Sequence, residues 1–215
     1  MAPETIGFAG EHLVITDQPD GTLTVSFETE GNGRKCGACQ LCCKLVPVPT
    51  IGKVAGQRCP KSKAGHGCTI YADRPMPCRL WSCRWLSDAK TAGMPRPDRA
   101  HYVIDMEADV IAVRDDETGG AIQLDVIQVW VDPAFPDAHR APELRAYLLM
   151  FAERYRAAAI IRWSSTKAMV LFAPPLTSDG TWHEESGPVV ARNSEEAMVL
   201  AQARERSVSV AMIPD

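Results

Sequence analysis

The cysteines are the residues of this chain best able to do chemistry, and all of them lie in one short segment. The sequence has 215 residues, and its eight cysteines all fall between positions 36 and 83. Thiolates bind zinc and iron, and disulfides do not persist in a reducing compartment. We therefore expect eight metal ligands: Cys36, Cys39, Cys42, Cys43, Cys59, Cys68, Cys78 and Cys83.

The first cysteines have the spacing of an iron-sulfur protein. In bacterial ferredoxins a Cys-x2-Cys-x2-Cys run supplies three ligands of a [4Fe-4S] cluster, and a remote cysteine is often followed by proline. Cys36, Cys39 and Cys42 form such a run, and Pro60 follows Cys59. Zinc also takes four thiolates, usually from two Cys-x2-Cys pairs, and only the first half of the segment has that spacing. The spacing favours iron-sulfur, and both metals stay open.

The adjacent pair Cys42 and Cys43 indicates more than one centre. Side chains of consecutive residues tend to point apart, so one of these thiols would serve each centre or bridge two metals. Cys78 and Cys83 are separated by roughly 140° on an ideal helix, so they would not share a face. Eight thiolates make two four-ligand sites. His66 is either a further ligand or, as we favour, a polar loop residue.

Charge is divided unevenly along the chain. Residues 34–99 contain 13 Lys and Arg against three acids, a charge of +10, and the rest carries −14. Cations near several thiolates stabilise their negative charge, which is the simpler explanation for the basic segment. Nucleic-acid binding through residues 34–99 is the less favoured alternative, because the basic residues follow no known recognition motif.

The N-terminal sequence and the hydropathy pattern predict a cytoplasmic protein with no membrane partner. Glu4 and Glu11 stand where a secretory signal would have basic and then apolar residues, so four disulfides in an exported protein are not expected. No apolar run approaches the ~18 residues of a membrane span.

The chain is predicted to have three regions, and the cysteines lie in the middle one. Residues 12–17 and 22–28 are expected to form a hairpin within an N-terminal unit, 1–33. Residues 34–99 form a proline-rich cysteine module whose one helix is expected near 77–86, with Trp81 and Trp85 on one face.

The C-terminal region, 100–215, is expected to pack with the hairpin. Its apolar patterns predict strands at 101–106, 109–114, 121–131, 158–163 and 168–173, and helices at 142–157 and 194–205. The apolar positions shift parity near Val126, which a bulge or burial on both faces would explain. The predicted fold class is therefore α+β: a β-rich body with two main helices and an irregular, metal-held cysteine module near the N-terminus.

The cysteine segment resembles a known family. CGACQLCC at Cys36–Cys43, CP at Cys59 and GCTIYADRPMPCR at Gly67–Arg79 are similar to the CxxCxxCC family, the YkgJ-type cysteine-cluster proteins described as zinc- or iron-chelating domains. The resemblance covers about residues 34–86. It implies metal binding by the seven matched cysteines, and Cys83 lies beyond the core motif.

The sequence therefore predicts a metal-binding protein, with one or two iron-sulfur centres in a redox, sensing or maturation role and a protein redox partner. The alternative is a structural zinc protein that acts as an interaction or nucleic-acid-binding scaffold. No catalytic motif is recognisable outside the cysteines, so an enzymatic activity is not favoured. His183-Glu184-Glu185 is the nearest candidate, and we interpret it as a solvated strand end.

Overall fold

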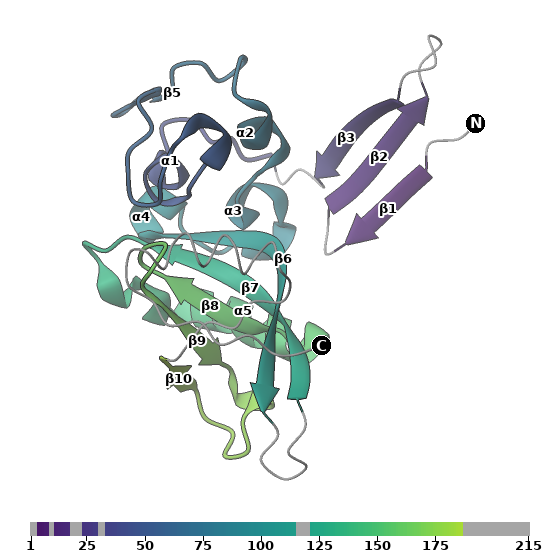
Figure 1. Ribbon diagram of the computed structural model, residues 1–215, viewed down its shortest axis with the longest axis vertical. Coiled ribbons are helices and arrows are strands. Elements are labelled where there is room, and N and C mark those ends of the chain that lie inside the picture. The colour runs from purple at the N-terminus through teal and green to yellow at the C-terminus, as the bar shows by residue number, and fades with distance from the viewer. Residues whose placement is uncertain (1–3, 9–10, 18–22, 30–32, 115–120, 187–215) are drawn as a thin grey trace.

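The computed structural model describes residues 4–8, 11–17, 23–29, 33–114 and 121–186. It is an α+β structure with a three-stranded sheet, a five-stranded sheet and a two-stranded ribbon. Figure 1 shows the cysteine module at one end of the five-stranded sheet, with the three-stranded sheet drawn to one side. The α+β class predicted from the sequence is thereby confirmed.

The N-terminal sheet contains the predicted hairpin. Strands β1 (Glu4–Phe8), β2 (Glu11–Asp17) and β3 (Leu23–Thr29) are antiparallel in the order β1-β2-β3. The register of β2 on β3 confirms the pairing of residues 12–17 with 22–28, whereas β1 was not predicted. The predicted turn at Pro19–Gly21 lies outside the described residues. Packing of this sheet against the C-terminal region stays a prediction.

The larger sheet has the order β10-β9-β8-β7-β6, and only β7 and β8 are parallel neighbours. Its strands are β6 (Tyr102–Arg114), β7 (Ala121–Val131), β8 (Ala158–Arg162), β9 (Ala168–Phe172) and β10 (His183–Glu185). The parallel connection requires a crossover, which η3 (Pro136–Arg140) and α5 (Pro142–Tyr155) supply. The predicted helix at 142–157 is thus confirmed, and the one at 194–205 lies outside the described residues.

Both faces of strand β7 are buried. Ile127 and Val129 pack under α5 with Leu148, while Leu124 and Val126 belong to an apolar cluster that also includes Ile160. Burial on both faces therefore explains the parity shift near Val126. A register shift does occur, but in the facing strand, between Asp105 and Asp109 of β6. The predicted strands 101–106 and 109–114 are consequently one irregular strand.

The cysteine module is made of very short elements. None exceeds five residues: α1 (Leu41–Leu45), η1 (Pro49–Ile51), β4 (Ser62–Lys63), β5 (Gly67–Cys68), α2 (Met76–Leu80), α3 (Arg84–Ser87), η2 (Ala89–Thr91) and α4 (Pro97–Ala100). The remaining short element, η4 (Pro174–Leu176), lies in the C-terminal region. The irregular texture predicted for the module is confirmed.

The single helix predicted at 77–86 is wrong. The chain is extended at Trp81 (φ −100°, ψ 137°) and at Cys83 (φ −73°, ψ 151°), so α2 and α3 are separate. The two tryptophans have different partners: Trp81 Nε1 donates to Asp105 Oδ1 (2.7 Å), and Trp85 Nε1 donates to the Met94 carbonyl (3.1 Å). These tertiary contacts override the local helical pattern, and they leave Cys83 free to face the other cysteines.

Apolar and polar contacts join the module to the sheet. Leu41 and Leu45 of α1 share a buried cluster with Val103 of β6 and Trp130 of β7. Lys44 Nζ lies 2.7 Å from Asp132 Oδ2, which is one realised contact between the basic module and the acidic remainder of the chain. At the other end of the interface, Tyr147 Oη donates to Asp88 Oδ2 at 2.7 Å.

Tyr147→Phe is expected to destabilise this interface by about 1–2 kcal/mol, because it removes the donor to Asp88 Oδ2 and leaves this buried carboxylate with the Lys90 amide on Oδ1. Urea denaturation at neutral pH measures the effect. Tyr155→Phe on the same helix is the control, since that half-buried ring makes stacking and cation–π contacts that phenylalanine retains. Equal free energies of unfolding for the two variants would contradict the role given to the Tyr147 hydroxyl.

Within the described residues, no helix has the length and apolar character needed to cross a bilayer.

Candidate metal site

Helix α1 holds the two adjacent cysteines. Its buried residues Leu41 and Leu45 anchor it to the module core, which fixes the direction of Cys42 and Cys43 between them. Just before the helix, the buried Gln40 side chain donates to the Lys63 carbonyl and accepts from Arg58 Nη1 at 2.6 Å. These bonds tie the helix start to the strand pair β4–β5, and so to Cys68.

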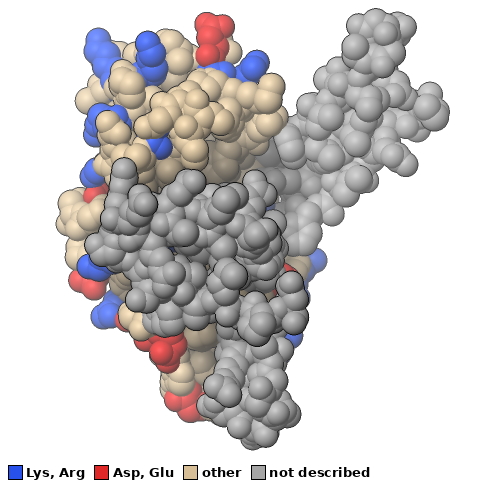
Figure 2. All heavy atoms as spheres, viewed as in Figure 1, with Lys and Arg blue, Asp and Glu red and all other residues tan. Residues whose placement is uncertain are grey.

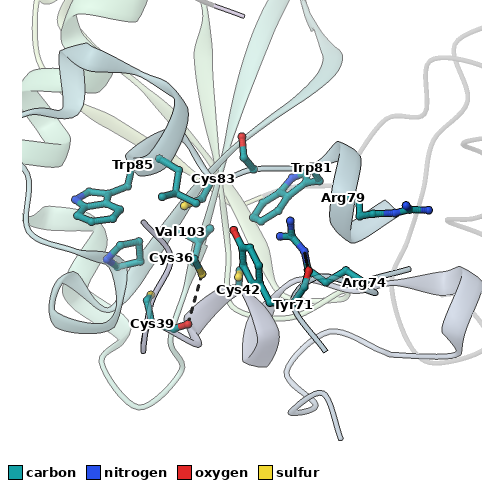
Figure 3. Close-up of a pocket in the computed structure, with 13 residues that line it drawn as sticks. Cys36, Cys39, Cys42, Tyr71, Arg74, Arg79, Trp81, Cys83, Trp85 and Val103 are labelled. Carbon is teal, nitrogen blue, oxygen red and sulfur yellow. Dashed lines mark hydrogen bonds between the residues drawn. The ribbon is translucent and has the colours of Figure 1, made fainter. Parts of the chain in front are cut away.

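Four of the predicted ligands line one cavity of about 130 Å³. Figure 3 shows Cys36, Cys39, Cys42 and Cys83 around this space, and we call them the cavity cysteines. They come from the segment before α1, from α1 itself and from the extended stretch before α3. The remaining wall is largely apolar or aromatic, with Tyr71, Trp81, Trp85, Leu86, Pro97 and Val103 among its members.

Of the thiols around this cavity, Cys39 and Cys83 are buried, and Cys36 and Cys42 are partly buried. Burial, together with the neighbouring sulfurs of Cys39 and Cys36, raises the pKa of Cys83 to about 12. Burial likewise raises the pKa of Cys36 to about 11, with the Cys39 sulfur adding to the effect. Protonated thiols are therefore favoured here unless a cation binds, because a metal ion is what deprotonates a coordinating thiol outright.

Backbone hydrogen bonds reach two of the cavity cysteines. Burial raises the pKa of Cys39, and hydrogen bonds from the backbone of Leu41 and Asp98 partly oppose that rise. Cys83 receives the same opposing contribution from the backbone of Leu86 and Trp85. Donors to sulfur are a common outer shell of metal-bound cysteines and influence the redox potential of clusters.

The other four cysteines share a second neighbourhood, and we call Cys43, Cys59, Cys68 and Cys78 the outer cysteines. The Cys59 amide donates to the Cys43 carbonyl at 2.8 Å, which fixes these two residues side by side. The pKa of Cys78 is raised by burial and then by the sulfurs of Cys43, Cys59 and Cys68. The two groups adjoin, because the sulfurs of Cys43 and Cys68 also raise the pKa of Cys36, a cavity cysteine.

A close backbone contact positions Cys68. Gly67 adopts φ +86°, and a Cβ at this position would lie 2.2 Å from the Gly37 carbonyl oxygen. Only glycine fits, because both the left-handed backbone and the contact exclude a side chain. The strand β5 is thereby held against the turn that follows Cys36, which brings the two groups of cysteines together.

Cys42 and Cys43 connect the two groups. A hydrogen bond between their side chains lowers the pKa of Cys43 to about 6 and raises that of Cys42 well above its ordinary value. Cys42 lines the cavity and Cys43 does not, as expected for neighbours that serve different centres. Their sulfurs nevertheless lie within hydrogen-bonding reach, so a bridging thiolate also remains compatible with the arrangement.

Lys53 is a buried cation that the sequence did not single out. It is 5% exposed, and its ammonium donates to the Val46 carbonyl. Burial lowers the pKa of Lys53, and the sulfurs of Cys43 and Cys59 oppose that shift. A buried ammonium is costly without a negative partner. Lys53 is therefore placed to balance thiolates among the outer cysteines, although no motif in the sequence signals it.

Arg74 is a second cation between the groups. Its guanidinium lies 3.8 Å from the centre of the Tyr71 ring, and Nε donates to the Tyr71 carbonyl at 2.9 Å. Figure 3 shows Arg74 at the wall of the cavity, beside Cys42 and Tyr71. Its charge opposes the rise in pKa at Cys36, a cavity cysteine, and at Cys78, an outer cysteine.

The cysteines surround space and do not converge on a point. Among the described residues, no three side chains of His, Cys, Asp or Glu form a group compact enough to hold a single ion as they stand. His66 is exposed, and its Nδ1 lies 3.0 Å from the Ala64 carbonyl oxygen, within its own loop. It does not line the cavity of the four cysteines.

The charged residues of β10 have structural partners. Glu184 pairs with Arg145 at 3.1 Å and with Arg140 at 2.9 Å, and His183 lies 3.0 Å from Asp179. These contacts fasten the edge strand to η3 and α5, away from the cysteines. His183 and Glu184 therefore have a structural role in holding this strand.

Comparisons of the chain with protein-family models, with curated proteins and with solved structures returned no match.

Proposed function

We propose that the cysteine module binds two metal centres, and that the cavity cysteines hold an iron-sulfur cluster of the [4Fe-4S] type. The protein would then act in electron transfer, in sensing or in cluster maturation. The observation that carries this proposal is the ring of four thiols around a cavity of about 130 Å³. The resemblance of residues 34–86 to the CxxCxxCC family supports metal binding without choosing the metal.

The size of the cavity favours a cluster over a single ion. Zinc binds sulfur at ~2.3 Å, which places four thiolates roughly 3.8 Å apart with no free space between them. The cavity of about 130 Å³ instead leaves open space between the four thiols. A cubane of four irons and four sulfides is a multi-atom body that keeps its cysteine ligands apart and would fill such a space.

The surrounding residues suit a redox centre. In this role Cys36, Cys39, Cys42 and Cys83 would be the ligands, and the cluster would supply one-electron chemistry. The indoles of Trp81 and Trp85 and the Val103 side chain would exclude water, since all three line the cavity. Solvent exclusion, nearby charge and hydrogen bonds to sulfur are the means by which a protein sets a cluster potential.

The outer cysteines would hold the second centre. Cys43, Cys59, Cys68 and Cys78 together provide four thiolates, the usual ligand number for an iron-sulfur cluster or for zinc. Lys53 and Arg74 contribute positive charge beside them, which offsets part of the negative charge of a thiolate site. Two nearby centres would let electrons pass between the interior cavity and a protein redox partner.

Electron paramagnetic resonance of protein purified without oxygen and reduced with dithionite tests the proposal. A reduced [4Fe-4S] centre gives a signal from an unpaired electron, and two neighbouring reduced centres give a spectrum broadened by their interaction. Zinc gives no signal in any state. A spectrum that stays silent in the oxidised and reduced samples, with iron absent, would contradict the proposal and favour a structural zinc module.

Arg74→Gln is expected to lower the midpoint potential of the cavity centre by roughly tens of millivolts, because removing a nearby cation favours the less negative oxidised state. Arg74→Lys is the matched control, since it keeps the charge and should leave the potential nearly unchanged. Titration of the visible absorption against redox mediators measures both variants. Equal potentials in Arg74→Gln and the wild type would refute this role for Arg74.

A further inference from the structure

A second, larger hollow adjoins the cysteine cavity and is lined by cations. Its volume is about 670 Å³, within the usual range of small-molecule sites. Arg34, Lys35, His66 and Arg79 contribute to its lining, which includes no Asp or Glu of the described residues. Figure 2 shows the wider setting: Lys and Arg side chains lie along the left edge and the top of the module in this view, where acidic side chains are few.

Two of these cations are available to a ligand. Lys35 and Arg79 are exposed, and neither forms an ion pair with any residue that the structure describes. Arg34 is different, because its guanidinium donates to the carbonyls of Trp85 (2.8 Å) and Ala92 (2.7 Å). Arg34 therefore builds the wall and adds charge, whereas Lys35 and Arg79 can reach into the hollow.

The hollow offers more than charge. The Ser82 side chain lines it and brings a hydroxyl that can donate to an oxygen atom, while Leu80 and Leu86 provide apolar surface. The fork of donors on a guanidinium such as that of Arg79 matches the paired oxygens of a phosphate or carboxylate. A small molecule with an oxyanion group and an apolar part is the ligand that this lining fits.

We propose that this hollow binds a small oxyanion ligand, a phosphate or carboxylate compound, through Arg79 and Lys35. The site shares a wall with the cysteine cavity, since both are lined by Cys36, Tyr71, Arg79, Ser82 and Leu86. A ligand bound there would lie next to the cavity cysteines and change the charge around them. The inference goes beyond the proposed metal centres and does not depend on which metal they hold.

Isothermal titration calorimetry with inorganic phosphate, and separately with succinate, tests the site on the full-length protein as purified. Ionic strength is kept constant with sodium chloride, and metal content is measured on every sample. The two probes distinguish a preference for phosphate from one for carboxylate. Arg79→Gln is expected to weaken binding of the preferred probe about tenfold or more, and Lys35→Gln to weaken it less.

Lys61→Gln is the control, because it removes one exposed charge from the module at a residue that does not line the hollow. It should bind as the wild type does. If Lys61→Gln and Arg79→Gln weaken binding of the probe equally, the binding comes from the overall positive charge of the module, and the proposal is overturned. Binding that Arg79→Gln leaves unchanged would also overturn it, since the anion would then be held elsewhere, for example on a metal. Absence of binding by both probes would overturn it directly.

Discussion

Cys83→Ser is expected to remove the metal of the cavity centre, and Cys43→Ser is expected to remove the metal of the outer centre. Cys83 lines the cavity with Cys36, Cys39 and Cys42, whereas Cys43 lies beside Cys59 and Cys78. If Cys43 bridges two metals, its loss also lowers the metal content of the cavity centre. The double variant should retain almost none. Elemental analysis of protein purified without oxygen measures all three.

Ser82→Ala is the control for these variants, because it changes the cavity wall without removing a thiol. It should keep the full metal content. Circular dichroism checks that each variant retains the sheet. If Cys43→Ser binds as much metal as the wild type, two centres with separate ligands are ruled out. If Cys83→Ser does so, Cys83 is not a ligand of the cavity centre.

Removal of the metal is expected to unfold the module while the five-stranded sheet survives. The module has no helix longer than five residues, so bound metal would supply much of its folding free energy, about 10–16 kcal/mol in small zinc domains. The sheet and α5 have their own core, which includes Val129, Leu148 and Ile161. Limited trypsin digestion with and without a strong chelator, followed by mass spectrometry, measures this difference.

The exposed residues Arg58, Lys61 and Lys63 are the expected cleavage sites in the chelated sample. A fragment containing Tyr102–Glu185 without a break in its described strands should persist. Cytochrome c digested with and without the chelator is the control, because its haem is held covalently and its digestion should not change. Identical protection of the module in both samples would show that its fold does not need metal.

The sequence predicted the elements whose signals are local. The helix α5 has apolar positions at helical spacing, and β7, β8 and β9 have dense β-branched and aromatic residues, so pattern and structure agree. The alternation of apolar residues along β7 was ambiguous because both of its faces are buried. A strand with one buried face alternates apolar and polar residues, and burial of both faces removes this alternation. Only the neighbouring elements could decide between the two explanations.

The break between α2 and α3 could not be predicted from the local pattern. Trp81 and Trp85 have the spacing of one helical face, yet their indoles donate to Asp105 and Met94 in other elements. Those partners are set by tertiary packing, which overrides a weak preference for helix. The break determines the site, because it carries Cys83 to the cavity.

The eight cysteines could be named as candidate ligands from their spacing, since thiols at short spacing have few other uses where disulfides do not persist. The division of the cysteines into two groups could not be predicted. Spacing alone assigned Cys83 to neither group and placed Cys59 with the first three cysteines. The structure places Cys83 around the cavity and Cys59 beside Cys43. Lys53 was also missed, because its importance comes from burial and not from any motif.

The most direct test of the two-centre iron-sulfur proposal is a visible absorption spectrum of protein purified without oxygen, with iron, zinc and acid-labile sulfide measured on the same sample. The proposal predicts a brown protein that bleaches on reduction and contains iron and sulfide in equal amounts. A colourless protein with about two zincs per chain would contradict it and make the module a structural clasp.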